Sequence, residues 1–182
     1  MKTILVLILA FPSLVAAAGE DCPGVRSLAV EAACREACGT RLMYDMCMDA
    51  LRDKFEPDPS RPVVVTAYAV LAAQRARSSY GATVDAASGL LRGSLGRDER
   101  AAYEACIEEY IYADLSMYRV ANDMLPSCRF GGLVEEYMKG VTYMEGCRDR
   151  LMRLPASPLY AMNLVDRNKE LLAYSLGQLL GI

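Results

Sequence analysis

Long segments with helical hydrophobic spacing alternate along the chain with short breaks rich in proline and glycine. The clearest segment spans residues 97–125, where apolar side chains recur at steps of three and four positions. These positions are Tyr103, Cys106, Tyr110, Ala113, Met117, Val120 and Met124. Charged residues fall mostly outside this stripe, so we predict that the stripe faces the core of a helical bundle.

Two further segments, residues 132–152 and 159–180, carry stripes of the same kind. The first consists of Val134, Tyr137, Val141, Met144 and Leu151, with Cys147 near the same face; the second consists of Met162, Val165, Leu172, Leu176 and Leu179, with Asn168 and Lys169 interrupting it. We expect both stripes to face the same core as the segment before them.

Three more helices are expected over residues 25–38, 41–55 and 63–92. Runs of β-branched residues are nearly missing, which favours helix over sheet. Four long amphipathic helices joined by short breaks are typical of an antiparallel bundle. The sequence therefore predicts an all-α fold: an antiparallel four-helix bundle preceded by an N-terminal helical hairpin.

The N-terminus has the features of a secretory signal peptide. A lysine at position 2 precedes a mostly apolar run over residues 3–15, and three alanines end at Ala18. The apolar run is shorter than the roughly 20 residues that span a bilayer, which disfavours a membrane anchor. We therefore expect residues 1–18 to be a signal peptide and residues 19–182 to form one domain of a secreted protein.

Seven cysteines and no histidine limit the chemistry that this chain can perform. In an exported protein the cysteines are expected to form disulfides that staple the fold. Without histidine, no Ser-His-Asp or Cys-His catalytic arrangement can form, and only Cys34 and Cys38 are spaced closely enough to suggest metal ligands. Neither a Gly-rich phosphate loop nor a marked carboxylate pair is evident. We therefore expect no enzyme activity, no metal and no cofactor.

The negative net charge of the chain limits the classes of molecule that it can bind. The formal net charge is −3 and the sequence pI is about 5.1. Nucleic acids and anionic membranes are poor partners for such a chain. We therefore expect the protein to bind neither nucleic acid nor a membrane.

Four cysteines occur in sequence motifs whose order along the chain points to a known protein family. The motifs are a predicted hairpin that carries Cys34 and Cys47, the sequence Tyr103-Glu104-Ala105-Cys106-Ile107-Glu108-Glu109-Tyr110, and the sequence Met144-Glu145-Gly146-Cys147-Arg148-Asp149. Together they resemble the plant invertase and pectin methylesterase inhibitor family. The stretch Tyr44-Asp45-Met46-Cys47 is similar to a subgroup of pollen allergens described as invertase inhibitors.

The resemblance implies two disulfides, Cys34–Cys47 within the hairpin and Cys106–Cys147 between two bundle helices. Cys38 could replace Cys34 as the partner of Cys47, because its spacing matches that of some family members. The remaining cysteines have no implied partner, and an odd total leaves one thiol unpaired or linked to another chain. They are Cys22, Cys128 and one of Cys34 or Cys38.

The resemblance also implies a function: a secreted inhibitor that occludes the active site of a plant acid invertase, in the cell wall (apoplast) or the vacuole. In invertase inhibitors a Pro-Lys-Phe motif between the second and third bundle helices reaches the sucrose-binding cleft. The same place here reads Pro126-Ser127-Cys128-Arg129-Phe130. Arg129 and Phe130 are therefore the candidate target contacts, expected at an exposed loop tip. The alternative for Phe130 is packing against the next helix.

Two other functions stay open. A pectin methylesterase inhibitor would cover a shallow cleft with polar residues of the bundle helices, for which Glu108, Asp114, Glu135 and Glu136 are candidates. A non-inhibitory secreted binding module of the same fold is the second alternative, because a fold does not by itself determine a function. Formation of a stable complex with a purified target enzyme would separate the inhibitors from the binding module.

Overall fold

The computed structural model describes residues 22–55, 58 and 60–182, so the predicted signal peptide, residues 1–18, lies outside the described residues. Six α-helices account for most of this part of the chain. They are α1 (Val30–Ala37), α2 (Arg41–Phe55), α3 (Val65–Leu91), α4 (Arg97–Arg119), α5 (Leu133–Leu151) and α6 (Pro158–Gln178), with a π-helical turn η1 (Val120–Met124) after α4 and two short strands β1 (Ser27–Leu28) and β2 (Val63–Val64).

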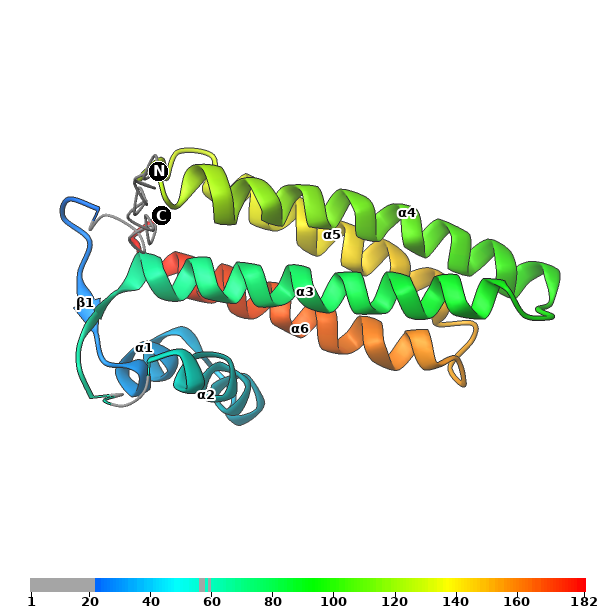
Figure 1. Ribbon diagram of the computed structural model, residues 1–182, viewed down its shortest axis with the longest axis horizontal. Helices are drawn as coiled ribbons and strands as arrows, with labels where there is room; N and C mark the ends of the chain where they lie inside the picture. The colour runs from blue at the N-terminus through cyan, green and yellow to red at the C-terminus, as the bar shows by residue number, and fades with distance from the viewer. Residues whose placement is uncertain (1–21, 56–57, 59) are drawn as a thin grey trace, which may run out of the picture.

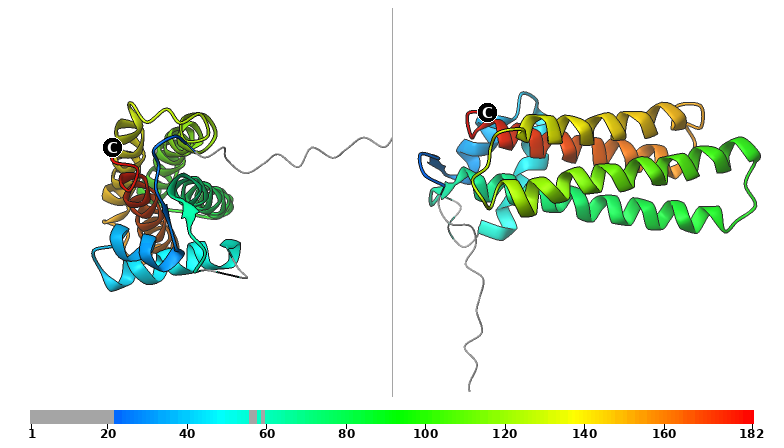
Figure 2. Two further views of the ribbon diagram at one scale, coloured as in Figure 1. Left: turned by 90° about the vertical axis from the view of Figure 1, so that its left-hand side faces the viewer. Right: turned by 90° about the horizontal axis from the view of Figure 1, so that it is seen from above.

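Helices α3 to α6 form an antiparallel four-helix bundle, in which each helix packs against two neighbours (Figure 1). Helices α1 and α2 form a hairpin beside one end of the bundle, against α3 and α6 (Figure 2). The all-α fold predicted from the sequence is thus confirmed. None of the helices in the described part of the chain combines the length and the apolar composition that crossing a membrane requires.

A short antiparallel strand pair ties the hairpin to the bundle. Residues Ser27 and Leu28 pair with Val64 and Val63, just before α3 begins. The predicted helix over residues 25–38 was therefore wrong at its start, since α1 begins only at Val30. Two-residue strands have no hydrophobic period of their own, so only the tertiary pairing reveals them.

The bundle core packs small residues against large ones. Helix α3 presents a row of alanines, while α4 and α5 contribute tyrosine and methionine side chains. The buried residues of these two helices include Tyr103, Cys106, Tyr110, Ala113, Met117, Tyr137, Met144 and Cys147. The predicted inward-facing stripes of both helices are thus confirmed as core packing, although Met124 and Val134 are only partly buried.

The last helix departs from its predicted stripe. Val165 was expected in the core but is 46% exposed. Three polar side chains, Asn163, Asp166 and Glu170, are fully buried instead. The sequence prediction assumed that only apolar residues face inward, and the structure shows that this face of α6 is polar at its centre.

Candidate functional site

The loop over residues 125–132 connects η1 to α5 and carries both predicted target contacts. Its backbone is held by hydrogen bonds: the amide of Arg129 donates to the carbonyl of Met124 at 2.9 Å, and the amide of Leu133 donates to the carbonyl of Phe130 at 3.2 Å. The π turn before the loop also closes with a hydrogen bond, from the amide of Leu125. The loop is therefore fixed at both ends by the helices that it joins.

A disulfide between Cys22 and Cys128 fixes the middle of this loop. It joins residues 106 positions apart, and Cys22 is only 3% exposed. Cys128 has a φ of 54°, in the left-handed region that residues other than glycine and asparagine seldom adopt. The sequence left the partners of both cysteines open, because no local pattern relates positions so far apart.

Arg129 projects from this fixed loop into solvent. No described residue forms an ion pair or a side-chain hydrogen bond with its guanidinium. An exposed guanidinium offers up to five donors in a planar fork that matches a carboxylate. The guanidinium of Arg129 is thus exposed, with no described partner within the protein.

The sequence left two placements open for Phe130: exposed at the loop tip, or packed against the next helix. In the structure Phe130 is only partly exposed and packs against the buried core. The next helix begins three residues later, at Leu133, whose side chain is fully buried. The chain therefore already approaches the core at Phe130. Phe130 therefore anchors the loop and leaves only part of its ring for a partner.

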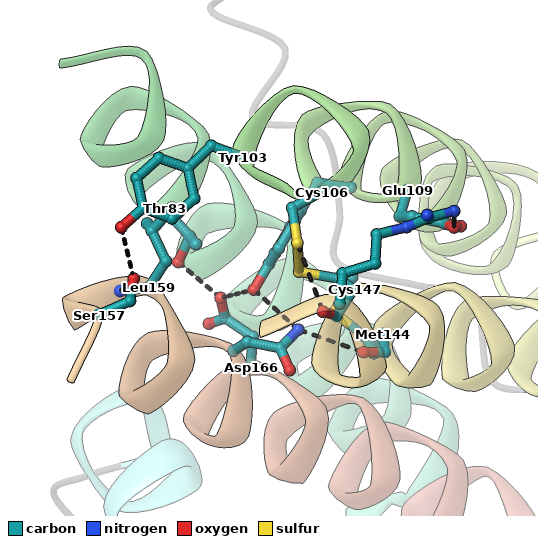
Figure 3. Close-up of a disulfide and its surroundings, with 12 residues drawn as sticks. Thr83, Tyr103, Cys106, Glu109, Met144, Cys147, Ser157, Leu159 and Asp166 are labelled. Atoms are coloured by element: carbon teal, nitrogen blue, oxygen red, sulfur yellow. Dashed lines mark hydrogen bonds and ion pairs between the residues drawn. A yellow bond between two sulfur atoms is a disulfide. The ribbon is translucent and has the colours of Figure 1, made fainter. Parts of the chain in front are cut away.

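The two disulfides that the family resemblance implies are both present in the structure. Cys34–Cys47 lies within the hairpin, and Cys106–Cys147 joins α4 to α5 (Figure 3). Cys38 forms no disulfide, and burial raises the pKa of its thiol. A partly buried, protonated thiol is a poor nucleophile, which disfavours exchange with the neighbouring disulfide.

Peptide mapping of the protein without reduction provides the direct check on this pairing. We expect three linked pairs, with Cys22 joined to Cys128, Cys34 to Cys47 and Cys106 to Cys147, and one alkylatable cysteine at position 38. A peptide in which Cys106 is linked to Cys22 or to Cys128 would contradict the placement of the bundle helices.

A polar cluster inside the bundle was not predicted from the sequence. The carboxylate of Asp166 on α6 accepts hydrogen bonds from Thr83 on α3 at 2.6 Å and from Tyr110 on α4 at 2.7 Å (Figure 3). Ser79 on α3 donates to the other oxygen of the same carboxylate. Burial, together with the negative charge of Asp166, raises the pKa of the Tyr110 phenol, so the phenol stays a donor. A buried carboxylate with three donors is satisfied in the fold.

Glu170 lies one turn further along α6 and is less well satisfied. It is completely buried, and its only described hydrogen-bond partner is the phenol of Tyr80. Its Oε1 atom is buried without a partner, and burial raises the pKa of this carboxyl well above its ordinary value. Gly140 of α5 makes room for it, since a Cβ there would collide with the carboxyl group.

The acidic residues considered for a pectin methylesterase contact divide into two groups. Asp114 is engaged by Arg77 at 2.8 Å, and Glu136 is engaged by Lys139 and Arg119. Glu108 and Glu135 are exposed. No group of three or more acidic or cysteine side chains in the described ranges could hold a metal ion.

The outer face of α4 carries an apolar stripe that the sequence analysis missed. Ile111, Leu115 and Tyr118 recur at helical spacing and are 44–58% exposed, and Tyr112 beside them is 44% exposed. Tyr112 stacks on Tyr143 of α5, with ring centroids 5.3 Å apart. The spacing from residue 111 to residue 118 could have revealed this stripe, but the inward-facing stripe of the same helix dominated the pattern.

Comparison with known proteins shows which solved structures share this fold. The sequence matches no known family model, and no curated protein matches it. Among solved structures, a mutant form of a pectin methylesterase inhibitor from Arabidopsis superposes with a TM-score of 0.66 at 18% identity, covering 81% of this chain and 93% of the other. A pectin methylesterase inhibitor from Arabidopsis thaliana gives a TM-score of 0.60 at 17% identity, covering 83% and 95%. At this level of identity the similarity establishes the fold: the chain is a disulfide-stapled helical bundle built like the plant pectin methylesterase inhibitors.

Proposed function

We propose that this protein is a secreted, non-catalytic inhibitor of a plant carbohydrate-active enzyme, and that its target is an acid invertase. The observation that carries the proposal is the exposed Arg129 on a loop fixed by a disulfide and by the two helices that it joins. We further propose that residues 1–18 are removed on secretion and that residues 19–182 act in the cell wall or the vacuole.

Rigidity is the property that an occluding inhibitor needs. A loop that is already ordered loses little conformational entropy on binding, so more of the contact energy appears as affinity. Backbone hydrogen bonds and the Cys22–Cys128 disulfide keep the loop in one conformation. Glycoside hydrolases carry a pair of carboxylates at the scissile bond, which is the acidic group that a projecting arginine would meet.

Phe130 has a supporting role in this proposal. Its side chain is only partly exposed and packs against the core, next in sequence to Arg129. We expect Phe130→Ala to lower the stability of the protein, by less than the 3–5 kcal/mol that removing a fully buried phenylalanine costs. Arg129 alone is therefore the cleaner position at which to test binding.

A pectin methylesterase is the second candidate target, and two observations favour it. The solved structures that share the fold are described as pectin methylesterase inhibitors. The exposed stripe of Ile111, Leu115 and Tyr118 offers the aromatic and aliphatic side chains that are typical of protein interfaces. In this case the bundle face, and not the loop, would carry the contact.

Inhibition assays with the Arg129→Ala variant separate the two targets. If the loop occupies an invertase active site, we expect the inhibition constant for a plant acid invertase to rise about 30-fold, since one interfacial arginine is worth about 2 kcal/mol. The thermal melt should change little, because Arg129 is exposed and has no described side-chain partner. Arg153→Ala is the matched control: it removes an exposed arginine near the opposite end of α5 and should leave inhibition unchanged.

The outcomes distinguish the candidates as follows. Inhibition of invertase that is unchanged in Arg129→Ala excludes Arg129 as the contact that carries inhibition. Inhibition of a pectin methylesterase, lost on Leu115→Asp and retained in Arg129→Ala, moves that enzyme to first place. A wild-type protein that forms no complex with either enzyme in size-exclusion chromatography would support the non-inhibitory binding module.

A further inference from the structure

A groove separates the N-terminal hairpin from the bundle. It lies between α2, α3 and α6 and has a volume of about 670 Å³. This is within the range of about 300–1,000 Å³ that is typical of small-molecule sites. Neither the bundle core nor the proposed inhibitory loop uses this space.

One wall and the floor of the groove are apolar. Helix α2 contributes Leu42, Met46 and Ala50, and the bundle contributes Ala72 and Leu172. Leu42 is 62% exposed, the largest exposed fraction among the large apolar side chains described. Covering this surface would remove apolar area from water, which is favourable.

The opposite wall is cationic and rich in hydroxyl groups. Lys169 of α6 lines the groove, and its Nζ atom donates to the Oγ of Ser79 at 2.7 Å, which leaves two ammonium donors without a described partner. Arg75 of α3 lines the same wall one turn before Ser79 and forms no described ion pair. Asp49 is the one acidic side chain on the lining of the groove, and it is exposed. The side chains that line the groove therefore include two cations and one acid, on a protein whose overall charge is negative; the carboxylate of Asp166 lies behind Ser79 and is not part of the lining.

We propose that this groove binds an amphipathic monocarboxylate, such as a medium-chain or long-chain fatty acid. The carboxylate would accept hydrogen bonds from Arg75 and Lys169, and the hydrocarbon chain would lie along Leu42, Met46 and Leu172. The cationic wall favours an anionic amphiphile over a neutral or cationic one. The apolar wall favours an anion that carries a hydrocarbon tail over a small anion without one. The site lies outside the loop of residues 125–132, so it does not depend on the proposed inhibitory function.

Isothermal titration of the purified, disulfide-bonded protein with dodecanoate, below its critical micelle concentration, tests the proposal. We expect saturable binding of one dodecanoate per chain. Arg75→Gln and Lys169→Gln should each weaken it by about tenfold, the loss expected for one charge-assisted hydrogen bond. Arg97→Gln is the matched control, because it makes the same charge change at an exposed position at the start of α4 and should leave the affinity unchanged.

Two further probes separate the contributions of the head group and the tail. Acetate presents the carboxylate without the tail, and dodecyltrimethylammonium presents the tail with the opposite charge; neither should bind saturably. Ala82→Trp, at an exposed position on the groove lining, should block dodecanoate without changing the thermal melt of the free protein. Absence of saturable dodecanoate binding, equal binding of the cationic amphiphile, or undiminished affinity in both the Arg75 and the Lys169 variants would overturn the proposal.

Discussion

Replacing Glu170 by glutamine is expected to make the protein more stable at neutral pH and to flatten the dependence of its stability on pH. The carboxyl group of Glu170 is completely buried, has one described partner in Tyr80, and has one oxygen with no partner at all. Burying a charge without a counter-charge is costly, so the folded protein holds this group in its neutral form. Glutamine has nearly the same shape and carries no charge at any pH.

The direction of the effect follows from the raised pKa. In the unfolded chain the carboxyl ionises near its ordinary value of 4.5, whereas in the folded protein its pKa is raised well above that value. Below pH 4.5 both states are protonated and the group costs nothing in stability. As the pH rises from there toward the folded pKa, the free energy of unfolding falls by up to about 1.4 kcal/mol per pH unit.

Denaturant unfolding between pH 4.5 and pH 8 measures this effect. The wild type should be most stable at the acidic end, and the Glu170→Gln curve should be flatter and cross above it. Two other groups lie near this carboxyl: Tyr80 faces it from α3 as its hydrogen-bond donor, and Asp166 lies one turn away with three donors of its own. Glu108→Gln, at an exposed position, is the control, and its curve should parallel the wild type. Parallel curves for Glu170→Gln as well would show that Glu170 is ionised in the fold.

Removing the Cys22–Cys128 disulfide is expected to cost about 5 kcal/mol of stability. The bridge joins residues 106 positions apart, and the entropy that a cross-link removes from the unfolded chain grows with the length of the loop it closes. Two double variants share the loss of the bridge: Cys22→Ala with Cys128→Gly, and Cys22→Ala with Cys128→Ala. Because residue 128 has a φ of 54°, the glycine variant should be the more stable of the two by about 1 kcal/mol.

The same variants connect stability to the proposed function. Without the disulfide the loop that carries Arg129 loses one of its three attachments, so inhibition should weaken even under conditions in which the protein remains folded. Cys38→Ala removes the thiol that has no disulfide partner and is the control, expected to change neither property appreciably. If the bridge-free variants unfold at the same denaturant concentration as the wild type, the link between Cys22 and Cys128 does not form in solution.

Much of the helical architecture could be predicted from local sequence. The inward stripe from Tyr103 to Val120 repeats with the helical period, and proline and glycine interrupt the pattern at most of the places where helices end. The expected helix boundaries lie within a few residues of those observed, apart from the start of α1 at Val30 and the end of α4 at Arg119, where the π turn η1 takes over. The bundle followed from these segments because antiparallel packing is the simplest way to bury four apolar faces joined by short loops.

Of the candidate site, the sequence predicted the position of the loop and its exposed arginine, Arg129, through the family resemblance. It left open whether Phe130 is exposed or packs inward, and it did not predict the attachment of the loop to Cys22. Both depend on which segments meet in space. A disulfide across 106 positions leaves no periodic trace in the sequence, and the burial of one aromatic ring depends on where the neighbouring helix starts.

The sequence by itself determined the elements of this protein: helix positions, the apolar faces of α4 and α5, and a cysteine content suited to stapling. Only the tertiary structure decided how polar groups are satisfied. Asp166 and Glu170 look like solvent-facing residues in the sequence, yet both are buried. Asp166 accepts hydrogen bonds from side chains of α3 and α4. Glu170 accepts one from Tyr80 of α3 and fits beside Gly140 of α5, which has no side chain there. Hydrophobic periodicity records the average character of a helix face, whereas hydrogen-bond partners far apart along the chain are set by the packing of the helices.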